Sequence, residues 1–235
     1  KNLRYELYSI EKKLAEVLAD HDVQAAKQRA LDFDLYVVTQ GHLAPGRSHE
    51  DIAEAVGKAG GRIIQLRDKR APLGRYFEHA KRIRDITRRY GMTFIVNDYV
   101  DVGRYVDADG IHLGQEDVPI KVARAALGPD KVIGISTHNL KQAIRAQHEG
   151  ADYISFGPIF ETPSKKGWKG LGVAALKEAQ RRIKIPIVAI GGIDESNLDD
   201  VLAAGVTRAA VIRAAGASKN IVKAVKELRA KFDSR

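Results

Sequence analysis

Eight short apolar runs, each followed by a longer helical pattern, narrow the fold of this chain more than any other feature. The runs cover residues 35–39, 62–67, 93–97, 110–114, 132–136, 153–157, 186–191 and 208–213. Strands that alternate with helices form parallel sheets with right-handed crossovers. Eight such units within residues 35–235 predict an α/β fold, a (β/α)8 or TIM barrel, rather than an open doubly wound sheet.

The segment before the first run, residues 1–34, has a different character. Its apolar positions recur with helical spacing in SIEKKLAEVLAD and again in DVQAAKQRALDF, so two helices are expected. We expect this N-terminal helical extension to pack on the outside of the barrel or to serve an oligomer contact, which makes a homo-oligomer possible. The predicted organisation is therefore an extension, 1–34, and one catalytic barrel domain, 35–235.

Composition excludes several classes of protein. The chain has no cysteine, so disulfides, thiolate metal sites and thiol nucleophiles are ruled out. No run approaches the roughly 18 apolar residues of a membrane span, and the charged N-terminus lacks the pattern of a signal peptide, so a cytoplasmic protein without a membrane partner is expected. The net charge of +9 would suit anionic partners. No RNA-binding or zinc-finger pattern accompanies it, so nucleic acid is not the expected partner.

Chemistry in a barrel of this type gathers where the strands end. On the second run, Gln65, Arg67 and Lys69 recur at every second position and so share one face of an extended chain. Further candidate residues follow the other runs at the same rim: Asn97, Asp98, Asp117, Ser136, Thr137, His138, Thr162, Ser164, Lys165, Lys166, Gly191, Gly192, Ile212 and Arg213.

Each of these features also has an ordinary structural interpretation. A lone Asp98 is more often a turn residue or a helix cap than a metal ligand. Asp117 would suit a helix start, Gly191-Gly192 a tight turn, and His138 a hydrogen-bonded residue near a helix start. Only the coincidence of carboxylates, amides, hydroxyls and basic side chains on one rim favours a functional site.

The charges on this rim suggest two anion sites. Two carboxylates on adjacent strands suit Mg²⁺, which is commonly held by one or two carboxylates together with substrate phosphates. Arg67, Lys69 and Lys165 would neutralise the same phosphates. The Gly-Gly turn and the end of the eighth run match the usual phosphate cup of such barrels. The pattern therefore suggests a pyrophosphate-bearing substrate that meets a phosphate-bearing one.

The order of the motifs resembles that of the thiamine phosphate synthase family. The likeness rests on LYVVT, QLRDK (65–69), NDYVDV (97–102), DGIHLGQEDVP (109–119), STHN (136–139), GADYISFGPIF (150–160) and IPIVAIGGI (185–193). The resemblance implies a transferase of thiamine biosynthesis. Such an enzyme joins 4-amino-5-hydroxymethyl-2-methylpyrimidine diphosphate to a thiazole phosphate and releases thiamine monophosphate and pyrophosphate.

The resemblance also implies roles for individual residues. Asp98 and Asp117 would hold Mg²⁺. The catalytic group would be Arg67, Lys69, Ser136 and Lys165. Residues that bind the pyrimidine diphosphate would be Gln65, Leu66, Arg67, Asp68, Lys69, Asn97, Ser136 and Lys165. Residues that bind the thiazole phosphate would be Thr162, Ser164, Gly192, Ile212 and Arg213.

Two points complicate this picture. Arg213 stands where the family usually has a small Ser, so it would either add charge to the thiazole phosphate site or partly fill it. The loop FETPSKKGWKGLG also resembles that of thiazole tautomerases, which aromatise the thiazole phosphate and need no pyrophosphate apparatus.

No nucleophile–base pair is visible in the sequence, so we expect no covalent intermediate. A non-catalytic phosphate- or nucleic-acid-binding barrel is a weaker alternative.

Overall fold

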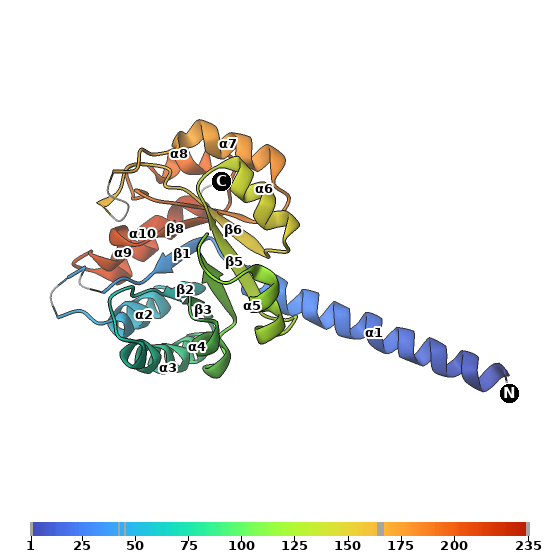
Figure 1. The fold of residues 1–235 in the computed structure, drawn as a ribbon. Coiled ribbons are helices and arrows are strands. Elements are labelled where there is room, and N and C mark those ends of the chain that lie inside the picture. Colours follow the sequence, from blue (N-terminus) through green and yellow to red (C-terminus); the bar gives the residue numbers. More distant parts are fainter. Residues whose placement is uncertain (1, 42, 45, 164–166, 234–235) are drawn as a thin grey trace.

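A computed structural model of the protein describes residues 2–41, 43–44, 46–163 and 167–233, with side chains from residue 12 onward. Its parallel strands close into a barrel in chain order from β1 to β8, which confirms the predicted (β/α)8 fold. Figure 1 shows the helices arranged around this barrel. The strands are β1 (Leu35–Val38), β2 (Ile63–Leu66), β3 (Thr93–Asn97), β4 (Gly110–Leu113), β5 (Val132–Thr137), β6 (Tyr153–Phe156), β7 (Ile187–Ile190) and β8 (Ala209–Val211). The helices are α1 (Asn2–Ala30), α2 (His49–Lys58), α3 (Leu73–Tyr90), α4 (Val100–Tyr105), α5 (Ile120–Leu127), α6 (Leu140–His148), α7 (Gly172–Arg182), α8 (Leu198–Leu202), α9 (Arg213–Gly216) and α10 (Ile221–Asp233).

Alternation along each strand divides the buried residues into two layers. On β2, Ile64 and Leu66 belong to the larger apolar cluster between the sheet and its helices, whereas Ile63 belongs to a smaller cluster inside the barrel. Because successive side chains point to opposite faces of a strand, Gln65 and the following Arg67 share the inward face with Ile63. The strand register therefore decides which residues of the QLRDK motif reach the site.

The prediction of two helices before the barrel was wrong. Residues 2–30 form one continuous helix, α1, because no Gly or Pro interrupts the segment between the two amphipathic stretches. Figure 1 shows this helix projecting away from the barrel, and its residues 12–20 are exposed. It meets the barrel near its C-terminal end, where Lys27 forms a 2.8 Å ion pair with Asp152. No helix in the described part of the chain, α1 included, combines the length and apolar character needed to cross a bilayer.

A buried carboxylate fastens the N-terminal end of the barrel. Asp34 is 7% exposed and lies 3.0 Å from Arg229 of α10 and 3.1 Å from Arg62 before β2. Burial by itself raises the pKa of Asp34, but the hydrogen bonds from Arg229 and the Leu35 backbone and the charges of both arginines bring it below its usual value. Asp34 therefore joins β1 to the last helix and to the second strand.

Replacing Asp34 by asparagine is expected to lower the free energy of unfolding at pH 7 by about 2 kcal/mol, because two arginines lose their buried partner. Since the folded pKa lies below the unfolded one, this stabilisation is complete above the unfolded pKa and is lost as the pH falls through the folded value. Urea unfolding at pH 7 and in steps below about pH 4 measures it. Asp32→Asn is the control, because that side chain is 75% exposed, and a deficit independent of pH would contradict the linkage.

Candidate active site

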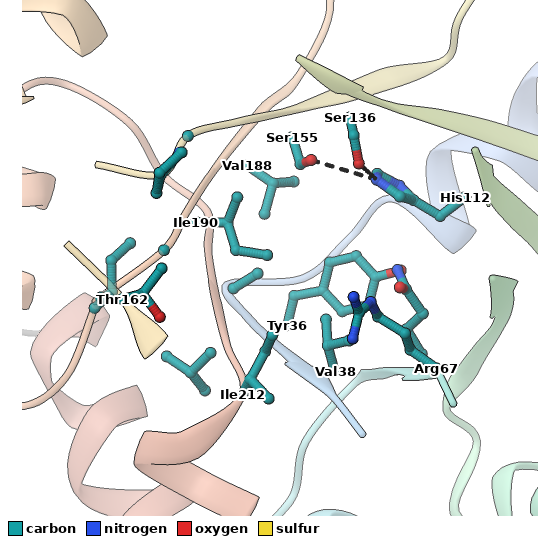
Figure 2. Close-up of a pocket in the computed structure, with 18 of the residues that line it drawn as sticks. Tyr36, Val38, Arg67, His112, Ser136, Ser155, Thr162, Val188, Ile190 and Ile212 are labelled. Atoms are coloured by element: carbon teal, nitrogen blue, oxygen red, sulfur yellow. Dashed lines mark hydrogen bonds between the residues drawn. The ribbon is translucent and has the colours of Figure 1, made fainter. Parts of the chain in front are cut away.

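A cavity of about 950 Å³ opens at the C-terminal ends of the strands. Figure 2 shows side chains from several strands converging on it, with the Arg67 side chain among them. The sequence-predicted site residues that line it are Gln65, Arg67, Lys69, Asn97, Asp98, Asp117, Ser136, His138, Thr162, Gly191, Gly192, Ile212 and Arg213. Residues far apart in the sequence thus meet at the rim where such barrels carry their chemistry.

Three predicted residues within the described ranges are not found among the lining: Leu66, Asp68 and Thr137, whose hydroxyl donates to the Ser155 carbonyl at 2.8 Å. Leu66 is fully buried on the outward face of β2, within the apolar cluster under the helices. Asp68 accepts hydrogen bonds from the backbone N–H groups of Arg70 and Ala71, and its other oxygen lies 3.1 Å from His49. Both therefore support the motif from behind the cavity. Three further predicted residues, Ser164, Lys165 and Lys166, lie outside the described residues.

The backbone places Asp98 at the mouth of the barrel. Asp98 has φ 65°, in the left-handed region that Asp tolerates better than most residues, and its N–H donates to the carbonyl of His112 at 2.9 Å. The chain thus turns sharply where β3 ends and directs the carboxylate to the rim. Lys69 lies 3.2 Å from one of its oxygens.

Asp98 and Asp117 form a carboxylate pair. Burial raises the pKa of Asp98; the charge of Lys69 opposes this, but the adjacent Asp117 raises the pKa again, and the net shift is upward. Two carboxylates this close favour a cation between them, because like charges at one site cannot both ionise freely. No cluster of three or more acidic or histidine side chains suitable for a metal occurs in the described ranges. This donor set fits an ion that completes its shell with substrate oxygens and water, as Mg²⁺ does.

Arg67 brings a positive charge to the cavity. Its backbone N–H donates to the Thr39 hydroxyl at 3.2 Å, which fixes the end of β2. No ion pair to its guanidinium occurs within the described part of the chain, and burial lowers the pKa of that group, against the attraction of Asp98 and Asp68. A half-buried guanidinium beside a cavity is a strong site for a phosphate group.

A second candidate anion site lies on the β7 and β8 side of the cavity. Gly191 and Gly192 have φ 98° and 68°, so the backbone turns tightly after β7 in a conformation that disfavours other residues. Ile212 and Arg213 follow β8 and line the same side, and Arg213 is exposed. The glycines, together with the start of α9, form a cup of the kind that holds a phosphate in barrels of this class.

The structure adds residues that the sequence did not single out. Tyr36, His112 and Ser155 line the cavity, and Tyr153 lies behind them. All four point inward because they fall on alternate positions of β1, β4 and β6, a pattern visible in LYVVT, GIHLG and YISFG. Single polar residues within short apolar runs did not signal a site.

Ser136 and His112 form a hydroxyl–imidazole pair that the sequence did not predict. The Ser136 Oγ lies 3.0 Å from Nε2 of His112 (Figure 2). Burial, together with the charge of Arg67, lowers the pKa of His112 to about 3 against the attraction of Asp117. Its other nitrogen meets the Tyr153 hydroxyl at 3.0 Å rather than a carboxylate. This imidazole is therefore too weak a base to activate a serine nucleophile near neutral pH.

Comparison with known proteins agrees with this geometry. The model of the thiamine monophosphate synthase family matches residues 35–215. The thiamine-phosphate synthase of Chloroflexus aurantiacus is 44% identical over 201 residues, which cover 85% of this chain and 93% of that protein. The thiamine-phosphate synthase of Synechocystis sp. is 42% identical over 228 residues, 97% of this chain but 63% of that longer protein.

A solved structure gives the same result. The thiamine phosphate pyrophosphorylase of Pyrococcus furiosus superposes with a TM-score of 0.80 at 38% identity and covers 88% of this chain and 98% of its own. The residues matched by the family model, 35–215, include all eight strands that carry the rim residues. The chain belongs to the thiamine monophosphate synthase family.

Proposed function

We propose that this thiamine-phosphate synthase joins 4-amino-5-hydroxymethyl-2-methylpyrimidine diphosphate to a thiazole phosphate by a magnesium-assisted, dissociative substitution. The observation that carries the proposal is the pairing of two unlike anion sites in one cavity. Arg67, Lys69 and the Asp98–Asp117 pair lie on one side, and the Gly191-Gly192 cup lies on the other. The two substrates would meet between them.

The residues on the first side would stabilise the departing pyrophosphate. Arg67 and Lys69 would hold its oxygens, and Asp98 and Asp117 would bind Mg²⁺, which neutralises charge on the leaving group. Lys165 is proposed for the same role on the strength of its motif. The bond from the pyrimidine methylene to the diphosphate oxygen breaks, its electron pair leaves with pyrophosphate, and the thiazole nitrogen forms the new C–N bond.

The proposed reaction does not pass through a covalent intermediate with the enzyme. The thiazole nitrogen carries its own lone pair, and the electron-rich aminopyrimidine supports a cation-like transition state. The weakly basic His112 leaves the Ser136 hydroxyl protonated, so Ser136 is suited to donate a hydrogen bond to the diphosphate. Gln65 and Asn97 would hold the pyrimidine side of the cavity, which aligns the two rings for reaction.

Pyrophosphate release with single components omitted tests this function. The complete mixture of protein, Mg²⁺, pyrimidine diphosphate and thiazole phosphate is expected to give pyrophosphate and a product with the mass of thiamine monophosphate. Leaving out either substrate or Mg²⁺ should abolish the product. Product formed at full rate in a chelator would contradict the metal, and thiazole phosphate binding without any product would favour a tautomerase.

Replacing Gly192 by alanine is expected to raise the KM for thiazole phosphate at least about tenfold while the KM for the pyrimidine diphosphate changes much less. A Cβ at this position would lie 2.7 Å from the Glu161 carbonyl oxygen and 2.7 Å from the Phe160 Cβ, in a backbone of φ 68°. Steady-state kinetics with each substrate varied measures both constants.

Gly205→Ala is a matched control for this substitution. Gly205 has φ 93°, but a Cβ there meets nothing within 4 Å, so the variant carries the backbone strain without the collision at the cup. If both variants raise the KM for thiazole phosphate equally, the cup is not where that phosphate binds.

The thiazole tautomerase reading has less support. The Asp98–Asp117 pair and Arg67 are suited to bind a pyrophosphate group, which a tautomerase would not need.

We further propose a cytoplasmic enzyme that acts on small phosphorylated molecules. Leu14, Val17 and Leu18 of α1 are available for a homo-oligomer contact, because each is more than half exposed. Absence of nucleic-acid binding stays a prediction, checked by salt-dependent binding assays.

A further inference from the structure

A chain of hydrogen bonds crosses the interior of the barrel beneath the cavity. Gln65 Nε2 donates to the Tyr36 hydroxyl at 2.8 Å, and that hydroxyl lies 3.2 Å from the hydroxyl of Tyr153. Tyr153 meets Nδ1 of His112 at 3.0 Å, and Nε2 of His112 meets the Ser136 hydroxyl at 3.0 Å. These hydrogen bonds therefore connect Gln65 on β2 with Ser136 on β5 through three residues that are at most 5% exposed, two of which, Tyr36 and His112, also line the cavity.

The direction of this chain follows from counting hydrogens. Each phenol has one hydrogen. The Tyr36 hydroxyl accepts from Gln65, so it donates its hydrogen to the Tyr153 hydroxyl, the other group that it contacts among the described residues. The Tyr153 hydrogen then goes to Nδ1 of His112. A neutral imidazole that accepts at Nδ1 donates at Nε2, so both hydroxyls beside Nε2, Ser136 at 3.0 Å and Ser155 at 3.3 Å, can only accept from it, and the shorter contact is the one to Ser136. The reverse direction would strand the buried Tyr36 hydrogen unless the Gln65 amide turned over.

This direction fixes what the two ends present to a ligand. The Gln65 amide turns its nitrogen toward Tyr36, where one of its two N–H hydrogens is used, so its carbonyl oxygen is turned the other way and is the acceptor presented to the cavity. No hydrogen bond from the described residues reaches that oxygen. Ser136 accepts from His112, so its own hydrogen is available to the cavity as a donor. One end of the chain is an acceptor and the other a donor.

We propose that Tyr153 and His112 are positioning residues that set this polarity, so that Gln65 accepts from the amino group of an aminopyrimidine and rejects a ring with an oxo group there. The inference rests on the proposed function for the identity of the diphosphate. Neither residue reacts with the substrate; each fixes the hydrogen-bonding state of a residue that touches it.

The hydrogen-bonded residues take up space inside the barrel that apolar side chains would otherwise fill. Tyr153 is fully buried in the inner cluster, and its phenol occupies the space where a side chain at Gly134 of β5 would stand. Around it the inner cluster is apolar, including Ile63, Ile95 and Val132. A buried phenol in such surroundings is costly unless its hydroxyl is paired on both sides, as it is here.

Titration calorimetry with two diphosphates tests the proposal. The wild-type protein is titrated with the 4-amino pyrimidine diphosphate and with its 4-oxo analogue, both with Mg²⁺ and without thiazole phosphate. The amino compound is expected to bind at least about 100-fold more tightly, because the oxo group would oppose the Gln65 carbonyl oxygen. In Tyr153→Phe the Tyr36 hydrogen loses its acceptor, so the amide becomes free to turn and the ratio should fall at least about tenfold.

Controls separate positioning from a general structural role. Tyr36→Phe breaks the chain at another point and should lower the same ratio, whereas Tyr105→Phe, at a 74% exposed position on α4, should leave it unchanged. If Tyr153→Phe weakens both diphosphates equally, or if the wild type prefers the oxo analogue, the proposed polarity is wrong. Turnover of the wild type, assayed in parallel, reports separately on the proposed function.

Discussion

Replacing Asp98 by alanine is expected to lower turnover about 10³-fold or more, because the variant loses one of the two carboxylates proposed to hold the metal on the leaving pyrophosphate. Asp98 and Asp117 lie close enough at the mouth of the barrel for the charge of Asp117 to raise the pKa of Asp98, so one carboxylate cannot reproduce the site. The affinity for thiazole phosphate, which is proposed to bind across the cavity, should change no more than a few fold. Pyrophosphate release and calorimetry with thiazole phosphate measure the two quantities.

Asp101→Ala is the matched control, since Asp101 is an exposed carboxylate three residues further on, in the first turn of α4. It should leave both quantities unchanged. Equal losses of turnover and of thiazole phosphate affinity in Asp98→Ala would mean that Asp98 supports the whole rim rather than a metal. The left-handed backbone at this position makes that alternative worth measuring, so Asp98→Asn should be compared as well.

Replacing Arg67 by alanine is expected to lower kcat by about 10²- to 10³-fold, and Arg67→Lys is expected to recover little of the loss. The guanidinium is half-buried, faces no carboxylate at ion-pair distance in the described residues, and can hold two phosphate oxygens at once. A lysine ammonium has the charge but not this geometry. Because the stabilisation grows as charge develops on the leaving group, kcat should fall more than the affinity for the diphosphate.

Steady-state kinetics and direct binding of the pyrimidine diphosphate separate these effects. Arg75→Lys, at an exposed position of α3, controls for a change of basic residue away from the cavity. If Arg67→Ala raises the KM for the diphosphate while kcat stays near that of the wild type, Arg67 contributes ground-state binding alone. Full activity of Arg67→Lys would contradict the two-oxygen contact.

The architecture and much of the site were predictable because they depend on local periodicity. Alternation of apolar runs with helical patterns predicted the closed barrel, and the rule that strand ends carry the chemistry brought Arg67, Asp98 and Asp117 to one rim. Spacing by two along β2 also predicted the inward face shared by Gln65 and Arg67, whereas Leu66, which the resemblance placed among the binding residues, has its side chain on the outward face.

Other features depend on contacts that no local pattern specifies. The pairing of the Tyr36 and Tyr153 hydroxyls joins residues 117 positions apart, and both tyrosines read in the sequence as ordinary strand residues. Asp68 belongs to the same motif as Arg67 and Lys69, yet two backbone N–H groups and His49 hold it behind the cavity. In α1 the amphipathic pattern changes between SIEKKLAEVLAD and DVQAAKQRALDF, which suggested a break between two helices. No residue of low helix propensity interrupts the segment at that point, so one continuous helix forms.

Magnesium binding with and without the pyrimidine diphosphate is the most direct measurement of the proposed mechanism. Two carboxylates that need substrate oxygens to complete an octahedral shell predict weak binding of Mg²⁺ to the protein alone. They predict much tighter binding once the diphosphate is present, and loss of that gain in Asp98→Ala. Calorimetry that found tight Mg²⁺ binding without the diphosphate, or a diphosphate-dependent gain unaffected by Asp98→Ala, would contradict a metal held jointly by this carboxylate pair and the leaving group.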